Sequence, residues 1–184
     1  MQFSHKWCIY SILFNEFFTV NPLLNKEPVK RAEKAIQAFD SKLKIICLEQ
    51  TARTAQDAAT ALGCNVGAIV KSLLFRTGDN FVLCLVAGDK RCALYKLKKI
   101  LNEKDVSMAK PDDVKKITGY TIRGVSPVGH LNKVKIYIDT NLERFKTVFA
   151  AAGHPNCVFK IEFNQLNKLT AGEIKEITEW DNQN

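Results

Sequence analysis

The sequence predicts an α+β fold, or mixed α/β, with strands and helices combined in a single domain. Helical spacing of apolar residues in Val29–Phe39 gives way to a short isoleucine-rich run at Leu43–Leu48, and such changes recur along the chain. Gly78 and Asp79 form a hairpin-type turn between two strand-like runs, so at least one strand pair is antiparallel. The 184 residues contain no internal repeat and no low-complexity linker, and they suit one domain with its own core.

In the first part of the chain, each expected element rests on a local signal. Val29–Phe39 carries one apolar stripe and is an expected helix, while Leu43–Leu48 is apolar enough for a buried strand. Ala55–Leu62 is an expected helix because Thr54 can cap its start and Gly63 can end it.

The middle of the chain predicts two strands followed by two helices. Ala68–Arg76 and Asn80–Ala87 are the strands, and the second is central because it is apolar on both faces. Arg91–Leu101 has helical spacing with its lysines on the more exposed side. Pro111–Thr118 is an expected helix because proline favours the first helical position and two aspartates follow it.

The last part of the chain predicts two strands and two or three helices. Lys133–Asp139 alternates apolar and polar residues, as a half-buried strand does. Asn141–Ala152 is an expected helix with Gly153 as its C-cap. Cys157–Phe163 is the last expected strand, and Leu166–Trp180 is expected to carry one or two short helices.

The N-terminal segment differs from the rest, so residues 1–24 are interpreted as an extension of unknown role and residues 25–184 as the domain. Met1–Val20 is rich in aromatic residues, but Asn15 and Glu16 interrupt its apolar core and no small-residue cleavage site follows. It is also too short and too polar to span a bilayer. Either the segment docks on the domain, or the start codon has been assigned too far upstream.

Charge and cysteine usage narrow the class of partner and the compartment. The 27 Lys and Arg residues against 19 Asp and Glu residues give a net charge of +8, which favours an anionic partner such as nucleic acid or an acidic membrane surface. The six cysteines show neither a C-x-x-C pair nor zinc-ligand spacing. The pattern is typical of reduced thiols in a cytosolic protein, and it indicates neither a metal site nor a catalytic cysteine.

The segment Gly119–His130 concentrates unusual backbone chemistry in a few residues. Its glycines tolerate positive φ and allow another molecule to come close, and Pro127 fixes φ and removes a donor. A loop constrained in this way between two strands suits the preformed wall of a binding site. An ordinary tight connection between strands explains the same pattern.

Lys71 lies in the middle of an otherwise apolar strand. Alternation places it on the same face as Ile69 and Leu73, where an ammonium group is costly unless it is paired. One interpretation is a cation held at a pocket wall for an anionic or carbonyl oxygen. The other is a snorkelling or edge-strand lysine.

Taken together, these segments resemble a known family. The strand Ile69–Phe75, the following run Phe81–Leu83, the loop ending at Gly129, the late Asp139 and the glycine Gly153 occur in the order seen in the YbaK/ProX family. Its members are free-standing relatives of the editing insertion domain of bacterial prolyl-tRNA synthetase. The resemblance covers roughly Val29 to Thr178. It implies a central mixed, mostly antiparallel sheet flanked by helices.

The resemblance implies hydrolysis, in trans, of the ester that joins a wrong amino acid to the terminal ribose of a tRNA. The expected substrates are Cys-tRNA(Pro) or Ala-tRNA(Pro), and the expected location is the cytoplasm. In such a site, backbone groups and a ribose hydroxyl of the substrate take the place of an acid/base pair. No cofactor, metal, membrane or DNA is implied. The implied partners are the acceptor end of the mischarged tRNA, with prolyl-tRNA synthetase as a further candidate.

The resemblance also implies the site residues. By their match to the family's strand lysine and loop, the implied catalytic residues are Lys71, Gly124, Ser126 and Pro127. The implied substrate-binding residues are Arg123, Val125, Gly129, Asp139, Gly153 and His154. Lys71 would hold the substrate near the ester and the terminal phosphate.

Two positions depart from the family pattern. Arg123 stands where glycine is usual, and it either stiffens the loop or adds a cation toward RNA. The second loop often has glycine where this chain has Asn156, which can adopt the same left-handed conformation. His154 then faces either the pocket or the solvent. These departures keep two alternatives open: a non-catalytic module that binds tRNA or the synthetase, and a protein that binds a small molecule or nucleotide.

Overall fold

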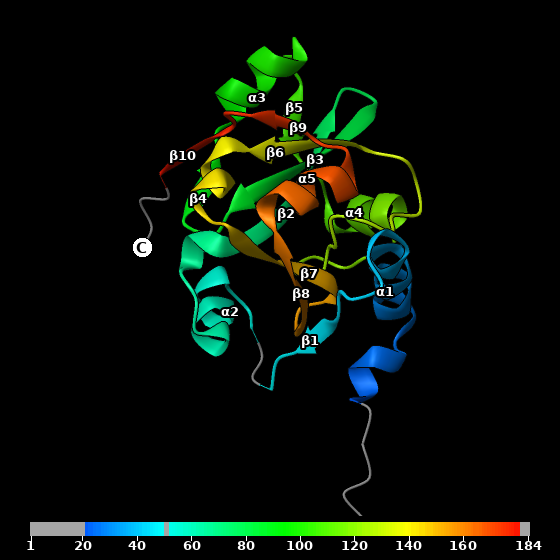
Figure 1. Cartoon of the computed structure of the whole chain (residues 1–184). Coiled ribbons are helices and arrows are strands. Elements are labelled where there is room, and N and C mark those ends of the chain that lie inside the picture. Colours follow the sequence, from blue (N-terminus) through cyan, green and yellow to red (C-terminus); the bar gives the residue numbers. More distant parts are fainter. Residues whose placement is uncertain (1–20, 50–51, 181–184) are drawn as a thin grey trace, which may run out of the picture.

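The computed structural model of the protein describes residues 21–49 and 52–180 (Figure 1). Most of the predicted N-terminal extension, residues 1–20, lies outside the described residues, and the boundary at residue 24 stays a prediction. Pro22–Asn25 form a short 3-10 helix, and Leu23 and Leu24 pack against the core. Within the described ranges, no helix is both long and apolar enough to cross a membrane.

The main sheet has the strand order β1-β8-β7-β2-β3-β6-β9, and β5 pairs with β2 beside this path (Figure 1). Its strands are β1 (Ile45–Cys47), β2 (Ile69–Thr77), β3 (Asn80–Ala87), β5 (Val106–Met108), β6 (Lys135–Asp139), β7 (Thr147–His154), β8 (Cys157–Glu162) and β9 (Glu173–Lys175). The pairs β2–β7, β3–β6 and β6–β9 are parallel, and the other pairs in this sheet are antiparallel. The predicted mixed, mostly antiparallel sheet is therefore confirmed.

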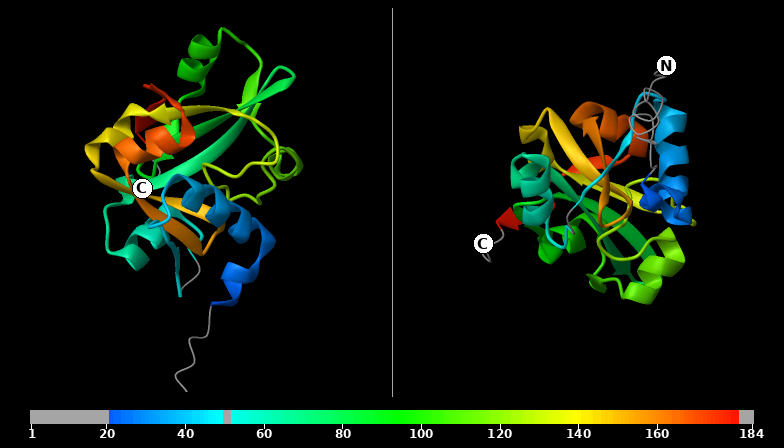
Figure 2. Two further views of the ribbon diagram at one scale, coloured as in Figure 1. Left: turned by 45° about the vertical axis from the view of Figure 1, so that its right-hand side comes forward. Right: turned by 90° about the horizontal axis from the view of Figure 1, so that it is seen from below.

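Five α-helices flank the sheet in the described part of the chain. They are α1 (Glu27–Phe39), α2 (Ala55–Leu62), α3 (Leu94–Leu101), α4 (Pro111–Thr118) and α5 (Phe163–Thr170). Short 3-10 turns occupy Val66–Ala68 and Thr140–Arg144, and a small second sheet pairs β4 (Lys90–Cys92) with β10 (Thr178–Trp180). Figures 1 and 2 show α1 and α2 on either side of the β7–β8 hairpin.

Alternation along β7 explains how two helices can pack against opposite faces of one hairpin. Val148, Ala150 and Ala152 are buried in the cluster that contains the apolar face of α1. Phe149 packs instead in the cluster of α2, together with Val158 of β8. The second face of the hairpin is thus partly covered by α2, and the remaining part borders a cavity.

Several local predictions are confirmed. The β2–β3 hairpin turns through Gly78, which has φ +55°, and it pairs Lys71 with Val86. Helix α2 begins with the predicted cap at Thr54, whose side chain accepts from the Asp57 N–H while Asp57 accepts from the Thr54 N–H. Gly63 ends that helix with φ +62°.

The predicted helix Asn141–Ala152 is wrong. A 3-10 turn covers only its first residues, and the rest is β7, paired with β2 on one side and β8 on the other. Gly153 is accordingly not a helix cap; it lies within β7 at a register irregularity, with φ +86°. The apolar residues of this segment fit both the helical period and the alternating period of a strand. Pairing with two neighbouring strands selects the strand.

Two further boundaries are corrected. The segment expected as terminal helices contains the end of α5 and then two strands, β9 and β10. The start of the helix expected over Arg91–Leu101 is strand β4, and α3 begins at Leu94. In both cases a three-residue strand completes a sheet edge, a contact that local periodicity does not reveal.

Candidate functional site

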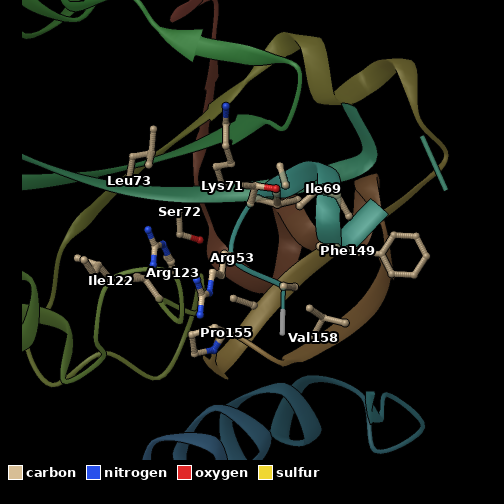
Figure 3. Close-up of a pocket in the computed structure, with 17 residues that line it drawn as sticks. Arg53, Ile69, Lys71, Ser72, Leu73, Ile122, Arg123, Phe149, Pro155 and Val158 are labelled. Carbon is tan, nitrogen blue, oxygen red and sulfur yellow. The ribbon is translucent and has the colours of Figure 1, made fainter. Parts of the chain in front are cut away.

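A cavity of about 350 Å³ opens between β2, the start of α2, the β7–β8 hairpin and the loop after α4 (Figure 3). It is lined by Ala52, Arg53, Thr54, Ala55, Ala58, Ile69, Val70, Lys71, Ser72, Leu73, Ile122, Arg123, Val125, Phe149, Ala151, Pro155 and Val158. Most of these side chains are apolar. The charged ones are all cationic, namely Arg53, Lys71 and Arg123. The cavity therefore suits a ligand with a small apolar part and an anionic part.

The loop Gly119–His130 is held by Tyr120, whose side chain is fully buried. The phenol oxygen lies 2.8 Å from the Val128 carbonyl oxygen and 3.0 Å from that of Gly129, and it donates to these acceptors. The Tyr120 hydroxyl, at the start of the loop, thus holds the far end of the loop in place. Gly129, with φ +73°, lets the two segments come this close, since a β-carbon there would lie 2.6 Å from the phenol oxygen.

Arg31 of α1 fixes both ends of the same loop. Its Nε donates to the Gly129 carbonyl at 2.8 Å, and its Nη2 donates to the Gly119 carbonyl at 2.9 Å. The guanidinium also lies 4.7 Å from the centre of the Tyr120 ring, and Nη1 pairs with Glu27 at 2.8 Å. Charged hydrogen bonds and a cation–π contact make this loop one of the better-fixed segments beside the cavity.

Within the loop, the predicted residues divide between the cavity wall and the support behind it. Arg123 and Val125 line the cavity. Ser126 is buried and supports the turn: its carbonyl accepts from His130 Nε2 at 2.7 Å, and its Oγ accepts from the Val128 N–H at 3.4 Å. Ser126, Pro127 and Gly129 are not among the lining residues.

The loop meets the end of β7 through its glycines. A β-carbon at Gly124 would lie 3.0 Å from His154 Cα and 3.2 Å from the Gly153 carbonyl carbon, so the two backbones are in contact. The predicted Gly124, Gly153 and His154 are therefore brought together. Pro155, which follows them, reaches the cavity.

His154 itself does not line the cavity. Its Nδ1 accepts from the Asn156 N–H at 3.2 Å, and its Nε2 lies 3.4 Å from Lys26 Nζ. Burial and the nearby Lys26 cation lower the pKa of His154. The ring stabilises the turn between β7 and β8, and it does not face the pocket.

Lys71 is on a central strand, since β2 lies between β7 and β3, which excludes the edge-strand interpretation. Its Nζ donates to the carbonyl oxygens of Gly88 at 3.1 Å and of Lys90. Figure 3 shows the side chain pointing away from Arg53 and Arg123. The lysine thus borders the cavity through its stem, while its ammonium group is satisfied by backbone carbonyls.

Asp139 lies apart from the cavity, at the end of β6. It is fully buried, and Thr178 Oγ1 lies 2.9 Å from each of its carboxylate oxygens, while Asn141 donates at 3.5 Å. Burial raises the pKa of this carboxyl group despite the hydrogen bonds from Thr178 and Asn141. Its contacts connect the main sheet to β10. Within the described residues, no three or more His, Cys, Asp or Glu side chains gather as a metal site.

Residues 49–169 match the aminoacyl-tRNA editing domain family. The chain belongs to this family. The resemblance to its YbaK/ProX members is confirmed, and the fold is similar to that of a crystal structure assigned as a candidate trans-editing enzyme for prolyl-tRNA synthetase. That similarity has a TM-score of 0.80 at 34% identity and covers 84% of this chain and 98% of the other.

Curated relatives point the same way. The editing domain is 32% identical over 127 residues to the uncharacterized protein YwhH of Bacillus subtilis, which covers 68% of this chain and 80% of YwhH. It is 27% identical over 130 residues to a proline–tRNA ligase of Caldicellulosiruptor bescii. That match covers 70% of this chain and 22% of the ligase, so the editing domain spans about a fifth of the ligase.

Four residues beside the editing-domain cavity were not predicted from the sequence: Arg31, Arg53, Ser72 and Tyr120. Arg31 acts on a loop far along the chain, and no pattern in the sequence indicates that contact. Ser72 had a weak signal, since a serine directly after Lys71 faces the other side of the same apolar strand. No pattern in the sequence indicated Arg53, apart from its position before the cap of α2.

His130 should make the stability of the editing domain depend on pH. Burial, and to a lesser extent the Arg31 cation, lower its pKa below the usual 6.5, although the hydrogen bond to Ser126 opposes this. The unfolded chain therefore binds a proton near pH 6.5 that the folded chain does not bind until lower pH. We expect the free energy of unfolding to fall as the pH drops below about 6.5.

The variant His130→Gln provides the control, because glutamine keeps an N–H donor toward Ser126 and does not titrate. Urea unfolding of both proteins between about pH 5 and 8 measures the effect. The wild type should lose stability relative to the variant only at the acidic end. Parallel stability curves over this range would show that His130 does not titrate on unfolding.

Proposed function

We propose that this protein is a trans-acting aminoacyl-tRNA deacylase that hydrolyses the ester of a mischarged tRNA, with Cys-tRNA(Pro) or Ala-tRNA(Pro) as substrate. The observation that carries the proposal is the cavity itself. It combines apolar walls with cations, and its lining contains no carboxylate, imidazole or thiol in the described part of the chain. Such a lining suits a reaction that depends on positioning rather than on a protein acid or base. The proposal places the protein in the cytoplasm, with tRNA as its partner and prolyl-tRNA synthetase as a further candidate.

The loop offers a donor for the charge that develops on the ester. The backbone N–H of Val125, which lines the cavity, makes no hydrogen bond within the described residues. Donors fixed before the reaction stabilise an oxyanion more than mobile ones do. The Val125 N–H would bind the carbonyl oxygen of the ester as it becomes negative.

Hydrolysis then proceeds with water as the nucleophile. The water oxygen bonds to the ester carbonyl carbon, and a neighbouring ribose hydroxyl of the substrate orients that water. The bond between the carbonyl carbon and the ribose oxygen breaks, and the ribose oxygen takes up the proton that the attacking water gives up. The products are the free amino acid and a tRNA with its terminal hydroxyl restored.

The apolar part of the cavity supports a small amino acid. Val125, Phe149, Ala151 and Val158 line it, together with Ile69. The same cavity must also accept the ester and part of the terminal ribose, which leaves little room for a large side chain. Each methylene group is worth about 1–3 kcal/mol of discrimination in such a pocket, so alanine and cysteine would be favoured over larger residues.

A second candidate function is a non-catalytic module that binds tRNA or the synthetase. Two observations favour it: the Lys71 ammonium group donates to backbone carbonyls, and Arg123 takes the left-handed conformation, at φ +69°, where relatives commonly have glycine. Both could weaken the hydrolytic geometry while leaving a cationic surface.

A panel of mischarged tRNAs distinguishes the two functions. We expect release of alanine or cysteine from tRNA(Pro), and a loss of rate of up to about 100-fold in Lys71→Ala. Lys71 ties the Gly88 and Lys90 carbonyls to the cavity strand β2, and a small displacement of a wall that positions the ester costs on the order of this factor. Lys98→Ala is the matched control, because Lys98 lies exposed on α3, away from the cavity. Tight tRNA binding without release of any amino acid would support the non-catalytic module.

A further inference from the structure

We propose that Arg53 and Arg123, with the Ser72 hydroxyl, bind the phosphodiester group that precedes the terminal adenosine of the tRNA. The inference rests on the proposed function, because it names the part of the substrate that this side of the cavity receives. It assigns to two arginines a role that the sequence suggested for Lys71. Arg53 lies just before the cap of α2, Arg123 lies in the loop after α4, and Ser72 lies on β2.

The rim of the cavity carries positive charge that is available to a ligand. Arg53 and Arg123 are exposed and line the cavity, and neither guanidinium takes part in a hydrogen bond or ion pair within the described residues. The carboxylate of Asp57 is close to Arg53, but it accepts the backbone N–H groups of Arg53 and Thr54 at 3.1 and 3.0 Å. It is thus committed to the cap of α2, and both arginines keep their donors for a ligand.

The hydroxyl group of Ser72 is buried beside the two arginines. Among the described residues, its Oγ is the one buried side-chain oxygen or nitrogen without a hydrogen-bond partner. Figure 3 shows this hydroxyl on the side of β2 that faces Arg53 and Arg123, opposite to the side chain of Lys71. A buried polar group without a partner is destabilising, and a bound oxyanion would supply the missing acceptor.

The backbone of Arg123 adopts an unusual conformation. Three described residues other than glycine have positive φ, and two of them, Asn102 and Ala171, end helices, where this conformation is common. Arg123 does not end a helix, and at φ +69° its β-carbon makes the conformation unfavourable. Strained residues cluster at binding sites, and here the strain holds a cation at the rim of the cavity.

The chemistry of the substrate identifies the anion. In an aminoacyl-tRNA the carboxyl group of the amino acid is esterified and carries no charge. The anion nearest to the ester is the phosphodiester between the terminal adenosine and the preceding cytidine. Guanidinium groups bind phosphate oxygens in a fork geometry, and two of them beside a hydroxyl would match its two free oxygens. Binding there would orient the ester toward the loop at Val125.

The test compares two small probes: cytidylyl-(3′,5′)-adenosine, and adenosine, which lacks both the phosphodiester and the cytidine. The arginine variants then isolate the contribution of the phosphodiester. Binding to the full chain is measured by calorimetry or NMR titration at several salt concentrations. We expect the dinucleotide to bind at least ten-fold more tightly than adenosine. Arg53→Gln and Arg123→Gly should each remove most of that advantage. Each should also reduce the slope of log affinity against log salt concentration by the amount expected for about one phosphate contact. Arg76→Gln is the matched control, since Arg76 pairs with Asp105 and does not line the cavity.

Arg123→Gly also separates ligand binding from folding. Glycine tolerates positive φ, so this variant should melt at the same temperature as the wild type or higher while it binds the dinucleotide more weakly. Equal binding of the two probes to the wild type would overturn the proposal. So would a dinucleotide advantage that survives both arginine variants and disappears in Lys71→Ala.

The outcome does not depend on the deacylase assay. If no mischarged tRNA is hydrolysed but the dinucleotide advantage depends on Arg53 and Arg123, the phosphodiester site stands and the proposed hydrolysis fails. If hydrolysis occurs and the arginine variants bind the dinucleotide normally, the proposed hydrolysis stands and the phosphodiester site fails.

Discussion

Replacing Gly153 with alanine is expected to destabilise the fold by about 3 kcal/mol. A β-carbon at this position would lie 2.6 Å from the Pro28 carbonyl carbon, 2.9 Å from the Val29 nitrogen and closer still to the Pro28 oxygen. These are backbone atoms at the start of α1, so they cannot move aside without moving the helix. The residue also has φ +86°, which disfavours any β-carbon. Denaturant unfolding of the purified variant measures the loss.

Gly63→Ala is the matched control for the conformational part of this effect. Gly63 has φ +62°, but a β-carbon there would meet no atom within 4 Å. Its substitution should cost only about 1 kcal/mol, from the positive φ alone. The difference between the two variants measures the contact between β7 and α1. Equal losses of unfolding free energy in the two variants would mean that α1 can move away from a β-carbon at Gly153 without destabilising the fold.

The Gly153 variant should also lose deacylation activity under conditions where it remains folded. Moving the start of α1 displaces Arg31, which holds both ends of the cavity loop, and it separates Gly124 from the end of β7. A displacement of this kind affects catalysis more than binding, because the ester must be held within a fraction of an ångström. The Gly63 variant should keep its rate.

Elements with local signals could be predicted from the sequence. The cap at Thr54, the hairpin turn at Gly78 and the proline at the start of α4 each act within a few residues, so their structural effect can be read along the chain. The mixed, mostly antiparallel sheet followed from the resemblance to a family, whereas the strand order is known only from the structure. The sequence left open whether Lys71 lies on an edge strand, and the structure places it on a central one.

Strand β7 shows where local patterns fail. Its residues are apolar at both helical and alternating positions, and the correct period depends on pairing with β2 and β8. A central strand gains two ladders of backbone hydrogen bonds and two apolar faces, which outweighs any local helical preference. The short strands β4, β9 and β10 were missed for the same reason.

The candidate site could be predicted only in part. The loop was expected as a pocket wall, and Arg123 and Val125 do line the cavity, while Ser126 and Pro127 lie behind it. Asp139, expected near the substrate, is buried away from the cavity. The roles proposed for all of these residues remain predictions that the assays above can test.

Replacing Arg31 with methionine is expected to destabilise the protein by about 2–3 kcal/mol and to lower the deacylation rate at least ten-fold. The substitution keeps an unbranched apolar stem beside Tyr120 but removes the donors to the Gly119 and Gly129 carbonyls, at 2.9 and 2.8 Å. Hydrogen bonds to a charged group contribute about 1.5–3 kcal/mol each, less the solvation that the exposed acceptors regain. Arg76→Met should have a much smaller effect on stability and none on the rate, since Arg76 pairs with Asp105 on the surface.

A double-mutant cycle with Tyr120→Phe tests whether the two residues act on the same loop. Arg31 and Tyr120 share the Gly129 carbonyl as an acceptor and are in cation–π contact. Residues that share a partner are not additive, so we expect a coupling free energy of about 0.5–1 kcal/mol in unfolding experiments. Strictly additive losses would show that each residue stabilises a separate part of the structure. Coupling in the unfolding free energy together with coupling in the deacylation rate would show that the loop fixed by Arg31 and Tyr120 is the one that positions the ester.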